Sequence, residues 1–241
     1  MTMVVRPALT FALAAAAAAA AGAQPIDALL VTGGHGFDEE PFLAMFEAMD
    51  DVEITHVVQP EANAIFETGD LGDYDVVVFY DMYQEITEEQ KAALLEAIEG
   101  GLGIVALHHH LASWGAWPEW HEILGGHYYT QETVVDGETR PASTFQHDVS
   151  VDVEVAGGHP ITEGVEDFTI YDEVYGSFWV SPEVEVLLTT DHPDSTREIA
   201  WATHYGEGLI AYIQLGHGRE AYENESYRTL VSNAIAWAAS D

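Results

Sequence analysis

The first half of the chain alternates between short apolar runs and stretches with helical periodicity. One predicted helix begins at Asp38, a residue type that favours the N-cap, and a second runs from the capping box Thr87–Gln90 to Glu99. Strands that alternate with helices predict an α/β fold with a doubly wound, mostly parallel sheet. Strands are predicted at 26–32, 52–58, 74–80 and 103–107, and the nearly continuous apolar runs of the last two predict strands that are buried.

The second half is richer in predicted strands. Residues 130–155 are expected to form β-rich excursions and 184–189 a further strand, while 198–205 and 209–215 form a hairpin around Gly206–Gly208. The chain closes on a predicted helix whose apolar face runs from Tyr227 to Trp237. No linker rich in Gly, Ser or Pro divides the sequence, so we expect a single domain over residues 24–241.

The first 23 residues have the pattern of a secretory signal peptide. A short, positively charged start precedes an alanine-dominated stretch over 7–21, and Ala21–Ala23 supplies the small-x-small pattern at which signal peptidase cleaves. The mature chain is therefore expected to begin near Gln24, to be secreted or periplasmic, and to leave the membrane after cleavage. A retained N-terminal anchor is the alternative, less favoured because the apolar stretch is short for a membrane span.

Composition excludes several functional classes. The chain has no cysteine, which rules out disulfides, thiolate metal ligands and a cysteine nucleophile. It carries 42 Asp and Glu against 6 Lys and Arg, a formal net charge of −36, so nucleic acid and anionic membranes are not expected partners. Because salt screens the repulsion between like charges, this balance also predicts a halophilic, salt-adapted protein. A merely acidic secreted protein is the alternative.

Three consecutive histidines, His108–His110, follow the predicted strand 103–107 directly. Ligands of open α/β sheets gather at the carboxyl ends of the strands, so this position favours a functional role for His108. Side chains alternate along an extended backbone, and the three imidazoles are then not expected to point the same way. Of the other two, we expect His110 to contribute to the site and His109 to pack.

Two further motifs give weak signals. Gly33–Gly36 follows the first predicted strand, but it lacks the G-x-G-x-x-G order and a nearby basic residue, so no nucleotide cofactor is expected. Ser113 lacks the G-x-S-x-G context of a hydrolase nucleophile. His35, within the first motif, would face the same edge of the sheet as His108 and is a candidate for binding substrate.

A series of short motifs lies between Gly100 and Trp237. They are Leu107-His108, Trp117–Trp120, Leu124–Gly126, His159–Gly164, Asp172–Tyr175, Ile199–Trp201, Tyr212–His217 and Tyr222–Asn224. In their order and spacing these segments resemble those of the ThuA-like (trehalose utilisation) family.

The resemblance implies a flavodoxin-like α/β fold related to the class I glutamine amidotransferases. In that wider group a nucleophilic cysteine lies on the turn after a central strand, whereas histidines stand at the corresponding turn here, so amidotransfer by a thiolate is excluded. The resemblance also implies a role in the uptake and breakdown of trehalose and related sugars, often by way of 3-keto intermediates.

Strand-end position and the family match together select the candidate site residues. In a chain this acidic, only the match distinguishes Asp172 and Glu173 from surface carboxylates. The catalytic candidates are His108, His217, Asp172 and Glu173. The substrate-binding candidates are His35, His110, Trp114, Trp117, His159 and Tyr175, the aromatic ones because their faces stack against the C–H faces of sugars. Ordinary packing is the alternative for the aromatic residues, and the fixing of a loop for His159.

Two chemistries suit this set. A divalent metal such as zinc, held by His108, His217 and Glu173, would polarise a sugar carbonyl or hydroxyl, or lower the pKa of a bound water. Without a metal, a histidine and an acid would move protons α to a keto-sugar carbonyl. We therefore expect an exported protein that processes or isomerises a sugar or keto-sugar. A non-catalytic, secreted carbohydrate-binding module is the alternative from a different class.

Overall fold

The computed structural model describes residues 24–135 and 137–240. The predicted signal peptide, residues 1–23, lies outside the described residues. Among the helices that are described, none combines the length and the apolar character needed to cross a membrane.

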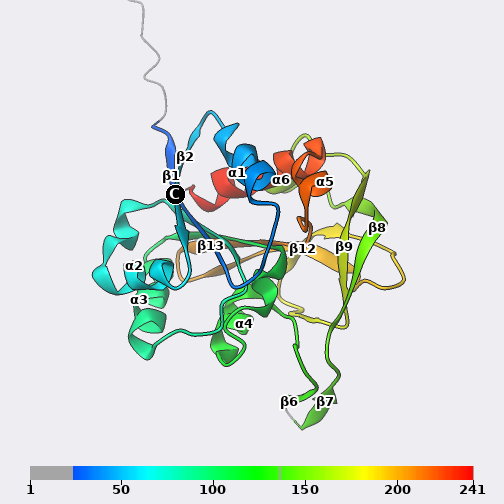
Figure 1. Cartoon of the computed structure of the whole chain (residues 1–241), viewed down its shortest axis with the longest axis horizontal. Coiled ribbons are helices and arrows are strands. Elements are labelled where there is room, and N and C mark those ends of the chain that lie inside the picture. The colour runs from blue at the N-terminus through cyan, green and yellow to red at the C-terminus, as the bar shows by residue number, and fades with distance from the viewer. Residues whose placement is uncertain (1–23, 136, 241) are drawn as a thin grey trace, which may run out of the picture.

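One nine-stranded sheet organises the molecule (Figure 1). Its order is β2 (Val52–Val58), β1 (Ile26–Gly33), β3 (Val76–Asp81), β4 (Gly103–Leu107), β13 (Gly208–Ile213), β12 (Glu198–Tyr205), β11 (Glu185–Thr189), β8 (Thr144–Val155) and β9 (Phe168–Gly176). The first five of these run parallel, and the last four continue the sheet with antiparallel pairing. The predicted flavodoxin-like α/β fold with a strand-rich second half is confirmed.

Helices cover both faces of this sheet (Figure 1). On one face lie α1 (Glu39–Glu47), α5 (Arg219–Tyr222) and α6 (Glu225–Ala238), and on the other lie α2 (Glu61–Thr68), α3 (Glu88–Glu99) and α4 (Pro118–Leu124). Alternate residues of β3 join the two cores, because Val76 and Val78 pack on the first face while Val77 and Phe79 pack on the second. A strand covered on both sides has to be apolar throughout, as this one is.

Local signals set several element ends as expected. The backbone N–H of Gln90 donates to Thr87 Oγ1 at 3.2 Å, and the Thr87 N–H donates back to Gln90 Oε1 at 3.0 Å, which completes the predicted capping box of α3. Asp38 does precede α1, but its side chain makes no cap there and instead accepts the backbone N–H of Arg219. The hairpin of β12 and β13 and the closing helix α6 are confirmed.

Short elements depart from the sequence pattern. The helices α2 and α4, of eight and seven residues, are too short to show a clear period. Two small sheets lie outside the main one: β5 (Gly126–His127) pairs with β10 (Trp179–Val180), and β6 (Thr133–Val135) pairs with β7 (Glu138–Arg140) as a projecting hairpin (Figure 1). None of these changes the arrangement of the main sheet.

Candidate functional site

The chain turns sharply where the central strand β4 ends. His108 has a φ of +49°, in the left-handed region that residues other than glycine rarely adopt, and residues His108–Ala112 form a 3-10 turn. Such a conformation costs of order 1–3 kcal/mol and is found mainly at functional sites. The expectation of alternating side chains along an extended backbone therefore fails here, because the backbone is not extended.

The imidazole of His108 is fixed through both ring nitrogens. Its Nδ1 lies 2.7 Å from the carbonyl oxygen of Gln214, which can only accept a hydrogen bond, so Nδ1 carries a proton. The opposite nitrogen, Nε2, lies 2.8 Å from the Tyr175 hydroxyl, 3.0 Å from Glu173 Oε2 and 3.2 Å from His217 Nδ1. When the ring is neutral, Nε2 carries a lone pair, and that lone pair faces the carboxylate of Glu173.

Three of the predicted residues converge at this point. His108 Nε2, Glu173 Oε2 and His217 Nδ1 form a triangle with sides of 3.0, 3.1 and 3.2 Å, although His108 follows β4, Glu173 lies within β9 and His217 lies in the loop after β13. Lone pairs at such distances repel one another unless positive charge lies between them. Protons on the imidazoles or a divalent cation would both supply that charge.

The carboxylate of Glu173 stays ionised in these surroundings. Burial alone would raise its pKa, but the hydrogen bonds and positive charge of His108 and His217 outweigh burial and bring the pKa below its ordinary value. The hydrogen bond to Glu173 in turn raises the pKa of His217. An ionised, inward-facing carboxylate between two imidazoles is the ligand state that a divalent metal needs.

Asp172 serves the site through the backbone. Its two oxygens accept the N–H groups of Gly216 at 2.7 Å and His217 at 2.8 Å, while burial raises the pKa of the carboxyl group. The side chain alternates away from Glu173 along β9, so Asp172 does not line the pocket. This predicted catalytic residue is better described as the support that holds His217 in place.

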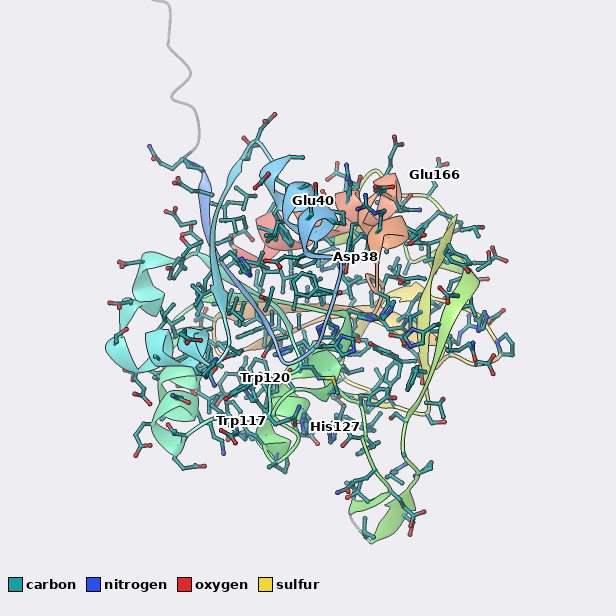
Figure 2. The ribbon with its side chains drawn as sticks, viewed as in Figure 1. Asp38, Glu40, Trp117, Trp120, His127 and Glu166 are labelled. Atoms are coloured by element: carbon teal, nitrogen blue, oxygen red, sulfur yellow. The ribbon has the colours of Figure 1, made fainter. Side chains whose placement is uncertain are left out.

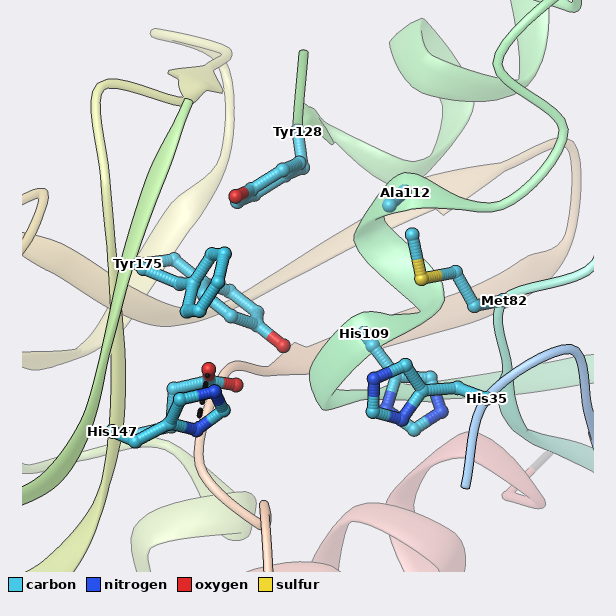
Figure 3. A pocket seen from close by; sticks show the side chains of 9 residues that line it. His35, Met82, His109, Ala112, Tyr128, His147 and Tyr175 are labelled. Carbon is cyan, nitrogen blue, oxygen red and sulfur yellow. Dashed lines mark ion pairs between the residues drawn. The ribbon is translucent and has the colours of Figure 1, made fainter. Parts of the chain in front are cut away.

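A pocket of about 160 Å³ opens beside the triangle (Figure 3). One wall is mainly aromatic and apolar, and the other carries imidazoles and the Glu173 carboxylate. The lining residues are His35, Met82, His109, Ala112, Tyr128, Phe145, His147, Glu173 and Tyr175. The predicted residues His35 and Tyr175 therefore lie at the pocket.

His109, not His110, lines the pocket. Its ring lies 4.7 Å from that of His35, and it is 4% exposed. Neither ring nitrogen has a partner with hydrogen-bond geometry among the described residues, although a Tyr80 backbone group weakly favours the protonated form. Burial nevertheless lowers the pKa of His109 well below its ordinary value, so the ring is neutral.

His147 is a pocket residue that no sequence motif marks. Its Nδ1 lies 3.0 Å from Glu173 Oε1 (Figure 3), and its ring lies 4.6 Å from that of His217. The pairing of β8 with β9 is interrupted between Gln146 and Val149, where Asp148 has a φ of +59°. This bulge directs His147 at the carboxylate, a common use of bulges beside functional sites.

Four substrate-binding candidates lie away from the pocket, which corrects those predictions. His110 Nδ1 bonds Asp81 at 2.7 Å, and its ring stacks on Phe79 at 4.6 Å on the α4 side of the sheet. Trp114 and Trp117 are buried against Trp120 (5.0 and 5.6 Å between rings), in the core beside α4 (Figure 2 labels Trp117 and Trp120). These three side chains fill an aromatic core rather than a sugar cleft.

The fourth, His159, supports a loop. Its Nδ1 accepts the backbone N–H of Ile161 at 3.2 Å, and its ring packs at 5.0 Å against Trp237 in α6. These contacts agree with the alternative, in which His159 fixes a loop and does not bind substrate.

Solved structures with the same fold include ThuA-like proteins. One from Parabacteroides merdae is 20% identical with a TM-score of 0.74, over 90% of this chain and 91% of that one. Another from Bacteroides uniformis is 21% identical with a TM-score of 0.65, over 92% and 94%. A protein from Salmonella typhimurium described as cytoplasmic is 15% identical with a TM-score of 0.61, over 87% and 98%. At these identities the likeness shows the fold alone.

The sequence itself carries the family assignment. No curated protein gives a significant match to the chain. The family model for ThuA, described as trehalose utilisation, matches residues 27–238, nearly the whole of the described chain, and the chain therefore belongs to the ThuA family.

Proposed function

We propose that this chain is an exported, metal-assisted enzyme that processes or isomerises a sugar or keto-sugar of trehalose-type metabolism. The observation that carries the proposal is the triangle of His108 Nε2, Glu173 Oε2 and His217 Nδ1 beside a pocket. Membership of the family supports a role in trehalose utilisation, and the signal-like N-terminal pattern supports export.

The donor set fits a divalent metal such as zinc. Tetrahedral ligands about 2.0–2.1 Å from zinc lie roughly 3.3–3.4 Å from one another, close to the 3.0–3.2 Å sides of the triangle. Three protein ligands leave one position open for substrate, as in catalytic zinc sites. Each ligand is also oriented by a partner: Gln214 holds His108, His147 holds Glu173, and Asp172 holds the backbone of His217.

A metal bound at this triangle would polarise a carbonyl or hydroxyl oxygen of the substrate. The chain's own residues would then bind, orient and move protons. Burial raises the pKa of Tyr175 well above its ordinary value, so its hydroxyl stays protonated and able to donate. His147 is 45% exposed at its side chain and bonded through Nδ1 to Glu173, which leaves its other nitrogen available to exchange a proton with solvent.

Deuterium exchange tests the proposed chemistry directly. We expect the metal-reconstituted protein, incubated in D₂O with a 3-ketoglucoside, to place deuterium on the carbon next to the carbonyl, as followed by NMR. Glu173→Gln should lower the exchange rate by at least about a hundredfold, the usual weight of a positioned acid or base or of its metal. His204→Ala, at an exposed position in β12, is the control and should exchange like the wild type.

The same experiment separates the two functional classes. Binding of saccharides without exchange or turnover across a panel of disaccharides and keto-sugars would contradict the enzyme proposal. It would favour the carbohydrate-binding module instead.

A further inference from the structure

Phe145 is an exposed aromatic residue in an otherwise highly acidic molecule. Five large hydrophobic side chains are strongly exposed among the described residues, namely Val58, Val134, Val135, Phe145 and Tyr171. Of these, Phe145 is the one that lines the pocket, and it is 58% exposed there. An apolar ring at the mouth of a pocket exposes hydrophobic surface to water, and a bound ligand can cover that surface.

The position of Phe145 in the sheet continues an aromatic wall. Phe145 in β8 is the register partner of Tyr175 in β9, and cross-strand partners share one face of a sheet. Tyr175 is 6% exposed and contacts Tyr128 edge to face at 5.1 Å inside the pocket. The wall thus runs from the enclosed Tyr175 outward to the exposed Phe145, whose ring also meets His147 edge to face at 5.0 Å.

The pocket itself is too small for a two-ring ligand. Its volume is about 160 Å³. Pockets that enclose larger ligands measure about 300–1,000 Å³. A ligand with one six-membered ring inside must therefore place any second ring outside, at the mouth.

We propose that Phe145 forms an outer subsite, on which the second ring of a two-ring glycoside lies while the first ring occupies the pocket. This inference rests on the proposed function, because it takes the pocket to hold a sugar ring. The chemistry recognised outside is an apolar ring face, supplied by the C–H face of a second sugar or by an aryl aglycone. Specificity for two-ring glycosides over one-ring sugars then originates at Phe145.

Calorimetric titration of the metal-reconstituted full chain tests the proposal with three probes that share one α-glucosyl ring. Methyl α-D-glucopyranoside has no second ring, trehalose has a sugar as its second ring, and phenyl α-D-glucopyranoside has an aryl ring. We expect the two-ring probes to bind about threefold to tenfold more tightly than the methyl glucoside, the range expected of one stacked ring. A gain for only one of them assigns the outer ring to that chemistry.

Substitution at Phe145 should remove this gain, so that the two-ring probes bind the variant no more tightly than the methyl glucoside binds it. Phe145→Ala is the test, and Phe145→Trp, which enlarges the platform, should preserve or increase the gain. Tyr171→Ala is the matched control, since Tyr171 is 49% exposed on β9 but does not line the pocket, and it should keep the gain. Both positions are exposed, so stability should change by little.

The proposal is overturned if all three probes bind equally, or if Phe145→Ala keeps the gain. In either case, the proposed function is still supported if the protein binds the methyl glucoside and contains the metal. Failure of all three probes to bind also overturns it, whereas the metal and exchange measurements decide the proposed function separately.

Discussion

At the scale of residues, the site depends on three side chains that lie far apart in the sequence. Family motifs mark all three residues: His108 and His217 follow strand ends, Glu173 lies within β9, and the structure brings them within 3.2 Å of one another. The choice of His110 over His109 was wrong because it assumed an extended backbone, whereas His108 turns with positive φ. His147 could not be found, since its direction depends on a bulge that leaves no sequence signal.

At the same scale, Asp172→Asn tests whether Asp172 positions a metal ligand. An amide offers one acceptor oxygen where two backbone N–H groups now donate to the carboxylate, so one of the Gly216 and His217 N–H groups loses its partner. We expect the metal affinity to fall about tenfold to a hundredfold, as for residues that orient ligands, and stability to fall by about 1–3 kcal/mol. Metal titration and urea unfolding measure the two effects.

Asp50→Asn, at an exposed position, is the control for that change. An unchanged metal affinity in Asp172→Asn would remove the positioning role. Complete loss of the metal in a folded variant would instead indicate that Asp172 is itself a ligand.

At the scale of elements, the sheet and its main helices follow from periodicity and capping, while the short pieces do not. The apolar runs predict β1, β3 and β4 because parallel strands covered on both faces cannot alternate, whereas β2, at the edge of the sheet, alternates between polar and apolar residues. The helix α2 and the strand β9 went unrecognised, because eight or nine residues carry little periodic signal and because Glu173 and Asp172 make β9 look like surface. Tertiary packing decides such segments.

Close packing of β4 against α6 makes Gly103 a sensitive position. A Cβ atom added there would collide with the backbone carbonyl of Ala238, which cannot move aside easily. We expect Gly103→Ala to lower the free energy of unfolding by about 1–3 kcal/mol or more. In Gly72→Ala an added Cβ meets no atom within 4 Å, so that variant should match the wild type in the same denaturant titration.

The junction of α4 and β5 should make the fold sensitive to acid. His121 and His127 stack at 3.5 Å, and burial lowers the pKa of His121 to about 3 and that of His127 to about 4. Because both pKa values lie below the unfolded value of about 6.5, the stabilisation is complete above pH 6.5 and is lost as pH falls toward 4. Between pH 7 and pH 4.5, urea titrations should show a smaller loss of the free energy of unfolding in His121→Phe than in the wild type. An equal loss in wild type and variant would contradict this account.

At the scale of the whole molecule, the main feature is the excess of carboxylates over Lys and Arg side chains. Carboxylates project all around the outline (Figure 2), and every Lys or Arg ion pair of the described residues has at least one strongly exposed partner and so contributes little. Salt should therefore stabilise the fold by screening repulsion. We expect the melting temperature to rise between 0.1 M and about 3 M NaCl and to rise less in sucrose of equal osmolarity. A melting temperature that is flat or falls with NaCl would contradict salt adaptation.

The central claim, that His108, Glu173 and His217 hold a divalent metal, is tested most directly by elemental analysis of the purified protein. We predict about one divalent ion per chain, removable by a chelator, in the wild type and in the control His204→Ala, and almost none in folded His108→Ala or Glu173→Gln. A wild-type protein that stays metal-free after incubation with zinc and similar ions, or variants that retain the metal, would contradict it.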